Sequence, residues 1–89
     1  MVWTIELTGK AEKQLAKLDR QTARRITQFL QDRVRQHDNP RELGKALTGD
    51  RLGSYWRYRV GDYRIICEIF DDRLVVLVLK VAHRREVYD

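Results

Sequence analysis

The stretch YWRYRVGDYRII, residues 55–66, contains the pattern that decides the fold. Apolar residues alternate with arginines on both sides of Gly61-Asp62, which is typical of two strands joined by a two-residue turn. This turn places Arg59 directly opposite Arg64 across the two strands. The hairpin therefore has one apolar face, which can pack against helices, and one face that carries Arg57, Arg59 and Arg64.

The residues after the hairpin predict a third antiparallel strand. Asp71-Asp72 marks a second turn, and residues 73–82 form the strand that follows it. Its centre, LVVLVL at residues 74–79, is apolar on both faces, which suits a strand in the middle of a sheet. Cys67 falls on the apolar face of the meander, and we expect it to be structural.

The first half of the chain predicts one short strand and two amphipathic helices. The strand covers residues 2–7, and Thr8-Gly9 can end it and cap the first helix. Apolar residues then recur with a helical period up to residue 18 and again from Asp19, a candidate N-cap, to about residue 37. Asn39-Pro40 ends the second helix, and residues 41–54 form an irregular connection.

Length and composition predict a single domain over residues 1–89. The 89 residues contain one cysteine, and the longest apolar run is too short to span a bilayer. We expect a cytoplasmic protein with no membrane association and no cofactor. We also expect no metal, because the spacing of the histidines and the cysteine fits no zinc site. The charge balance is 18 Lys+Arg against 13 Asp+Glu, a net charge of +5. Because most of the cations are arginines, phosphate is a plausible ligand.

Two segments are candidates for function. The arginine face of the hairpin places like charges opposite each other, which favours an anionic ligand such as phosphate. The tail HRREVYD, residues 83–89, contains groups that can transfer protons or stabilise negative charge. The alternative for both segments is that their charges are simply solvated.

Three segments together resemble the RelE/ParE superfamily of bacterial toxin–antitoxin toxins. They are KALTG at residues 45–49, the hairpin at residues 55–66 and the ending VAHRREVY at residues 81–88. The resemblance implies an α+β fold in which an N-terminal strand and a three-strand meander form a four-stranded twisted sheet. The helical hairpin would cover one face of that sheet.

The RelE branch of this superfamily implies a metal-independent endoribonuclease that cuts messenger RNA in the ribosomal A site. Phosphate would be held by basic residues around the hairpin, and Arg84 would stabilise the leaving oxygen. Because arginine is a poor general base, His83, Tyr88 or a water molecule would accept the proton. The expected catalytic set is Arg57, Arg59, Arg64, His83, Arg84 and Tyr88, and the expected RNA-binding set is Lys45, Arg57, Arg59, Arg64 and Arg85.

The rival hypothesis is a ParE-like toxin that inhibits DNA gyrase by binding, without nuclease activity. The set of basic residues and the tyrosine near the end of the chain favour the nuclease, since the ParE branch generally lacks them. Both branches imply a cognate antitoxin as partner, and the nuclease adds the 70S ribosome and messenger RNA. We expect an acidic or apolar antitoxin segment to cover the helical surface or the arginine face.

Overall fold

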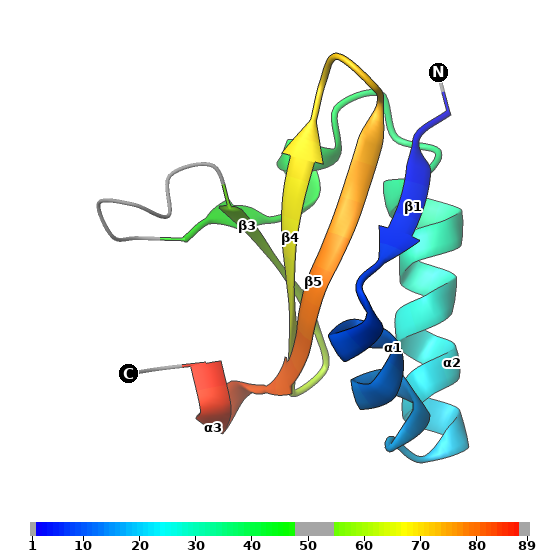
Figure 1. Ribbon diagram of the computed structural model, residues 1–89, viewed down its shortest axis with the longest axis vertical. Helices are drawn as coiled ribbons and strands as arrows, with labels where there is room; N and C mark the ends of the chain where they lie inside the picture. The colour runs from blue at the N-terminus through cyan, green and yellow to red at the C-terminus, as the bar shows by residue number, and fades with distance from the viewer. Residues whose placement is uncertain (1, 48–54, 88–89) are drawn as a thin grey trace.

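The computed structural model describes residues 2–47 and 55–87, and these residues form an α+β domain with a five-stranded mixed sheet (Figure 1). The strand order is β1-β5-β4-β3-β2. The fold class predicted from the sequence is confirmed, with one strand more than expected, the two-residue β2. The elements are β1 (Thr4–Leu7), α1 (Gly9–Ala16), α2 (Arg20–Gln28), η1 (Phe29–Val34), η2 (Pro40–Leu43), β2 (Lys45–Ala46), β3 (Tyr55–Val60), β4 (Tyr63–Phe70), β5 (Val75–His83) and α3 (Arg84–Val87).

The two long helices begin at the predicted capping residues. The Thr8 side chain accepts a hydrogen bond from the amide of Ala11, and Asp19 does the same for Thr22. The second helix does not continue as an α-helix to residue 37. Its last turns, η1, are π-helical, with the Arg35 amide donating to the carbonyl of Leu30.

The strand register at the hairpin agrees with the sequence prediction. Arg59 pairs with Arg64 in the antiparallel β3/β4 ladder, and the turn is Gly61-Asp62. Between β4 and β5 the register shifts at Ile66/Cys67, so one residue of β5 bulges out of the ladder. The turn before β5 spans residues 71–74 rather than two residues, because Leu74 has a positive φ of 53° and the strand begins only at Val75.

The central position predicted for the apolar strand is confirmed, since β5 lies between β4 and a parallel β1. Beyond the end of β1, the side chains of Thr8, the cap of α1, and of Gln14 in α1 form hydrogen bonds with the backbone at this edge of β5. The Thr8 hydroxyl donates to the Leu79 carbonyl, and the Gln14 amide oxygen accepts from the amide of Val81. These contacts satisfy backbone groups that an open strand edge would leave exposed.

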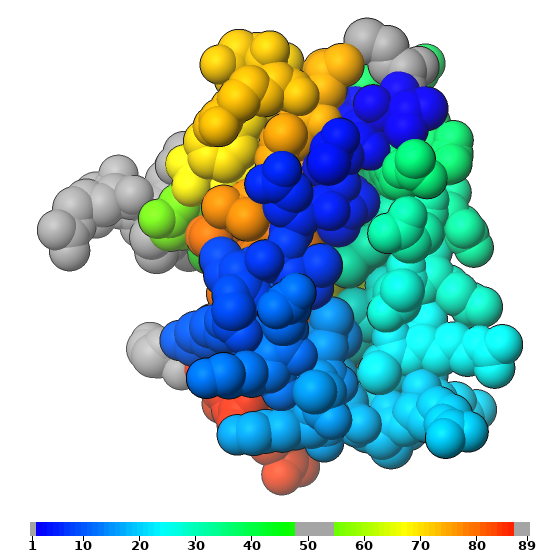
Figure 2. All heavy atoms as spheres, turned by 45° about the vertical axis from the view of Figure 1, so that its right-hand side comes forward, coloured from blue at the N-terminus to red at the C-terminus, as the bar shows by residue number. Residues whose placement is uncertain are grey.

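The hydrophobic core lies between the sheet and the helices α1, α2 and η1, which cover one face of the sheet (Figures 1 and 2). Cys67 is fully buried there, and burial raises the pKa of its thiol. The opposite face, called the open face below, carries the exposed Arg59 and the half-buried Arg57 on β3, whereas Arg64, Ile66 and Ala82 on its β4 and β5 part are buried. Within the described residues no helix has the length and apolar character needed to cross a membrane. The buried core residues are Trp3, Ala11, Ile26, Leu30, Val34, Tyr58, Val60, Ile65, Cys67, Ile69, Val76, Val78 and Val81.

Candidate functional site

The open face of the sheet contains a pocket that brings together three of the predicted residues. Lys45 pairs with Arg57 across β2 and β3, so their side chains lie on the same face, and Arg59 follows two residues later. All three line a cavity of about 260 Å³. Lys45 and Arg59 are exposed and Arg57 is half-buried, so a phosphate can approach the three cations from solvent.

The segment before β2, η2, is fixed to the rest of the molecule by its backbone carbonyls. The buried hydroxyl of Tyr58 donates to the Pro40 carbonyl at 2.7 Å, and the Trp56 indole donates to the Arg41 carbonyl at 2.9 Å. Both donors come from β3, where the alternation of the strand directs them away from the arginine face. β3, which carries Arg57 and Arg59, therefore also positions η2, the segment on the other side of the pocket.

A bidentate ion pair adds a third anchor to η2. The guanidinium of Arg41 donates two hydrogen bonds of 2.9 Å to the Asp71 carboxylate in the turn before β5. The interaction lowers the pKa of the Asp71 carboxyl and raises the pKa of Arg41. Arg41 also lies over the ring of Trp56, 5.8 Å from its centroid.

Gly44 allows the chain to pass close to β3 on its way into β2. A Cβ atom at this position would clash with the Arg57 carbonyl oxygen and would lie 2.8 Å from the Tyr58 ring. Any larger residue would push Lys45 away from Arg57. The sequence alone predicted an irregular connection here but not this close contact.

Arg64 lies on the same face, but its surroundings differ from those of Arg57 and Arg59. Arg64 is only 6% exposed. It lies between Ile66 and Ala82, two buried residues at neighbouring positions of that face. Its guanidinium donates to the carbonyls of Gly61 and Tyr63 at 3.4 and 3.3 Å. Arg64 therefore stabilises the β3–β4 turn while adding positive charge beneath the open face.

Glu42 is the residue of this pocket that the sequence analysis missed. It lines the cavity with Lys45, Arg57 and Arg59, and its carboxylate oxygen lies 3.7 Å from Nε2 of His37. A carboxylate can accept a proton, which an arginine cannot do. Its position in a segment without hydrophobic periodicity gave no signal that it would face the arginines.

The end of β5 places Arg84 at the tip of the hairpin. Its amide donates to the Asp62 carbonyl at 2.7 Å, and its Nε lies 3.9 Å from the Asp62 carboxylate. Arg85 follows on the short helix α3, and both arginines are exposed. The structure thus ties Arg84 to the turn of the arginine hairpin, as a residue beside the pocket rather than within its lining.

His83 lies on the opposite face of the sheet from Arg57 and Arg59. It pairs with Tyr63, and the two rings make an edge contact at 5.4 Å between centroids. Its side chain lines a cavity with residues of α1, including Lys17. The structure therefore does not bring His83 together with the arginine pocket, and Tyr88 lies outside the described residues.

His83 instead caps α3. Its Nδ1 accepts a hydrogen bond from the amide of Arg85 at 3.2 Å, and its own amide donates to the Glu86 carboxylate at 3.0 Å. This reciprocal pair is similar to a capping box with histidine at the N-cap position, except that the histidine ring bonds to the second residue of the helix, not the third. Since Nδ1 accepts, the proton of a neutral His83 ring is on Nε2.

A helix-covered α+β sheet with a cationic pocket on its open face defines a class of small basic proteins that fits the resemblance seen in the sequence. A family model described as "ParE toxin of type II toxin-antitoxin system, parDE" matches residues 5–88. The chain therefore belongs to this toxin family of the RelE/ParE superfamily.

The relatives support the RelE-like branch of the superfamily. The chain is 28% identical to Toxin RelG of Mycobacterium tuberculosis, over 99% of this chain and 98% of that protein. Among solved structures, the RelBE2 toxin–antitoxin complex of M. tuberculosis matches with a TM-score of 0.84 and 27% identity, over 97% of this chain and 95% of that one. The archaeal RelE–RelB complex of Pyrococcus horikoshii matches with a TM-score of 0.76 and 27% identity, over 98% and 100% of the two chains.

Proposed function

We propose that this toxin is a ribosome-dependent endoribonuclease that cleaves messenger RNA in the ribosomal A site. The observation that carries the proposal is the pocket in which Lys45, Arg57 and Arg59 surround a volume of about 260 Å³. In the proposed reaction the 2′-oxygen of a nucleotide attacks the adjacent phosphorus and the bond to the 5′-oxygen breaks. The leaving 5′-oxygen takes a proton from water, so the products are a 2′,3′-cyclic phosphate and a 5′-hydroxyl.

The cations of the pocket stabilise the additional negative charge that forms at phosphorus during the attack. Arg57 and Arg59 bind the non-bridging oxygens, since a guanidinium fits a phosphate with two parallel hydrogen bonds. Lys45 adds a point charge from β2. Arg84, held beside Asp62, stabilises the leaving 5′-oxygen. Because the stabilising groups are side-chain cations, the proposed reaction uses no metal.

Glu42 is the general base that the pocket itself offers. It is the carboxylate that lines the pocket together with the three cations, and removing the proton from the 2′-hydroxyl requires such an acceptor. We expect Glu42→Gln to lower the cleavage rate about 100-fold or more. The matched control is Glu6→Gln, an exposed carboxylate on the far strand β1, which should cleave at the parent rate. Equal rates for all three proteins would assign the base to another group.

The test of the function is a reconstituted translation reaction with and without ribosomes, with the 5′ ends of the messenger mapped by primer extension. We expect cuts at codon-spaced positions only when ribosomes are present. The second candidate is gyrase inhibition by binding, which the family's description as ParE toxins favours. An intact messenger together with inhibited DNA supercoiling by purified gyrase would establish that candidate instead.

We also propose a cognate antitoxin as partner. Two of the matching structures, from M. tuberculosis and P. horikoshii, are complexes of a toxin with its antitoxin. An antitoxin that neutralises this chain has to keep phosphate out of the pocket or keep the toxin away from the ribosome. Co-expression with the antitoxin should restore growth that the toxin alone inhibits.

A further inference from the structure

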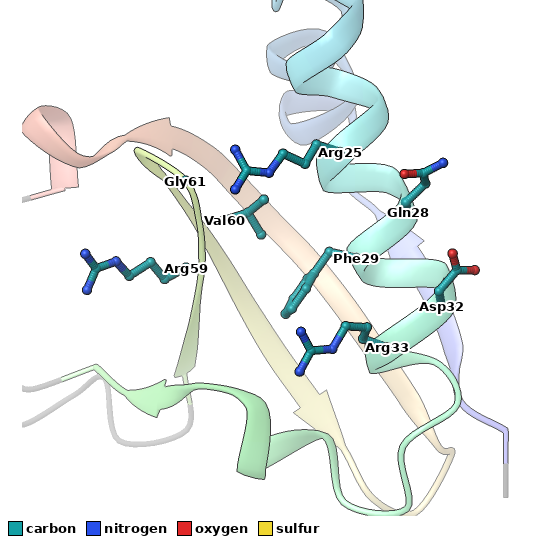
Figure 3. A pocket seen from close by; sticks show the side chains of 8 residues that line it. All are labelled: Arg25, Gln28, Phe29, Asp32, Arg33, Arg59, Val60 and Gly61. Atoms are coloured by element: carbon teal, nitrogen blue, oxygen red, sulfur yellow. The ribbon is translucent and has the colours of Figure 1, made fainter.

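The residues on the open face of β3 continue beyond the cationic pocket to an aromatic side chain. Figure 3 shows the Arg59 side chain pointing away from α2 and η1, whereas Val60, the next residue, points toward them. Because side chains alternate along a strand, Tyr55 and Arg57 share the face of Arg59. Tyr55 therefore lies one step, about 7 Å, beyond Arg57 along the same face.

A carboxylate lies beside the ring of Tyr55. Glu68 of β4 is the direct partner of Tyr55 in the β3/β4 ladder. Counted from the two-residue turn, the two residues share no backbone hydrogen bonds, and in such pairs the Cα atoms are about 4.5 Å apart and the side chains are closest. Both residues are half-buried. Within residues 2–47 and 55–87 the Glu68 carboxylate forms no ion pair, so it is free to accept hydrogen bonds from a ligand.

An aromatic ring one step from a phosphate site is a platform for a nucleic-acid base. Bases of single-stranded RNA stack on aromatic side chains, while cations nearby bind the backbone. With a phosphate bound at Arg57 and Arg59, the base of the same nucleotide can reach Tyr55, since one ribose separates the two groups. The cationic pocket and the ring together therefore fit one nucleotide.

Glu68 adds selectivity to this platform. A carboxylate accepts hydrogen bonds and donates none, so beside a stacked base it can accept from an amino group on the base edge. Adenine, cytosine and guanine each carry such a group. Uracil has an oxygen, O4, where cytosine has its amino group, and its one N–H lies between two carbonyl oxygens that repel a carboxylate.

We propose that Tyr55 and Glu68 form a binding site for one RNA base, which stacks on the ring and is selected for an amino group against uracil. The messenger as owner of this base rests on the proposed function, whereas the binding of a nucleotide does not. The base belongs to a nucleotide next to the cut phosphate. Cleavage beside adenine, cytosine or guanine is therefore favoured over cleavage beside uracil.

The first experiment titrates the ¹⁵N-labelled toxin with cytidine and uridine monophosphates and follows the backbone amides by NMR. The 3′- and 5′-phosphate isomers of each nucleotide test the two directions of the RNA chain. We expect one cytidine isomer to shift the amides of residues 55–59 and 66–68 and to bind about fivefold or more tightly than the matching uridine isomer. Equal affinities for the two bases, or shifts confined to other parts of the surface, would refute the base site.

Glu68→Gln tests the selectivity, because a glutamine side chain can donate as well as accept. We expect this variant to bind the cytidine and uridine isomers with affinities within about twofold of each other. The matched control is Glu6→Gln, the same change in charge in the same row of the sheet, two strands away, since Glu6 and Glu68 both pair with Leu77. The control should keep the preference for cytidine. An equal loss of preference in both variants would show a general charge effect and overturn the assignment of Glu68.

Two variants of Tyr55 test the stacking platform. Tyr55→Phe keeps the ring and should bind the cytidine isomer within about twofold of the parent affinity. Tyr55→Leu keeps the apolar character but removes the ring, so it should weaken binding of both nucleotides about fivefold or more. Urea midpoints show whether each variant is folded. Parent affinity in a folded leucine variant would exclude stacking on this residue.

Cleavage assays identify the owner of the base. Messengers that differ by cytosine or uracil next to the cut, on either side, are compared in the translation reaction. We expect the parent protein to cut one cytosine messenger faster than its uracil counterpart and Glu68→Gln to lose this difference. A parent protein without any preference, or a preference that the variant keeps, would refute the messenger base and leave ribosomal RNA as its owner. If the parent protein cuts no messenger, the proposed function fails, while the nucleotide titration still decides whether the base site exists.

Discussion

Gly61 sets the geometry of the hairpin that carries the arginines. Its φ of +58° is a left-handed conformation, whereas Asp62, the other turn residue, has no positive φ. A positive φ at only the first central position matches a type II′ turn, which glycine favours there. A Cβ atom would also lie 3.0 Å from the Arg25 guanidinium, so any side chain adds a contact to the backbone strain.

We expect Gly61→Ala to lower the free energy of unfolding by about 1 kcal/mol, measured by urea denaturation, because alanine is strained in the left-handed region. The control is Gly9→Ala at the first position of α1. A Cβ atom there has no neighbour within 4 Å, and φ is not positive. That variant should be at least as stable as the parent. Equal stability of the Gly61 variant would mean that the turn adopts another conformation in solution.

At the scale of elements, η2 owes its position to contacts with two other parts of the chain. β3 holds its carbonyls through Trp56 and Tyr58, and the turn before β5 holds Arg41 through Asp71. The pKa of the Asp71 carboxyl is lowered by Arg41. The ion pair therefore stabilises the fold above the ordinary carboxyl pKa of about 4, and this contribution is lost as the pH falls through the lowered pKa.

We expect Asp71→Asn to destabilise the protein at pH 7 by a few tenths to about 1 kcal/mol, since the pair is largely exposed. The difference from the parent should shrink toward zero as the pH falls below 3. The control is Asp72→Asn in the same turn, whose carboxylate lies 4.0 Å from Nε of the neighbouring Arg73. Urea midpoints measured from pH 7 to pH 2.5 give the comparison. A constant difference at all pH values would exclude the ion pair as its cause.

The elements that the sequence predicted well are those fixed by local chemistry. The two-residue turn sets the register of Arg59 against Arg64, and the capping residues Thr8 and Asp19 set the helix starts. The features it missed depend on contacts between distant segments. β2 has only two residues and no apolar pattern, and Glu42 reaches the site only because β3 anchors η2. The sequence could not predict on which face of the sheet His83 lies, because LVVLVL at residues 74–79 has no polar–apolar alternation and a bulge in β5 shifts the register.

At the scale of the whole molecule, the sheet separates two surfaces with different roles. The open face carries the cationic pocket with Arg57, while His83 lies on the helix face and caps α3. We therefore expect different phenotypes when Arg57 and when His83 is replaced. Loss of Arg57 removes charge stabilisation at phosphorus, whereas loss of His83 removes a helix cap and releases Arg84 from its place beside Asp62.

We expect Arg57→Ala to lower the ribosome-dependent cleavage rate about 100-fold or more, without a change in the urea midpoint. His83→Ala should lose about 1 kcal/mol of local helix stability and cleave more slowly. His83→Asn should recover most of the cleavage rate, because asparagine is a good N-cap. Since asparagine cannot transfer protons as an imidazole does, this variant separates the capping role from a role in proton transfer. Primer-extension time courses measure all three rates. If the asparagine variant is as slow as the alanine variant, the His83 imidazole takes part in the chemistry itself, and the face of the sheet it occupies must also contact the messenger.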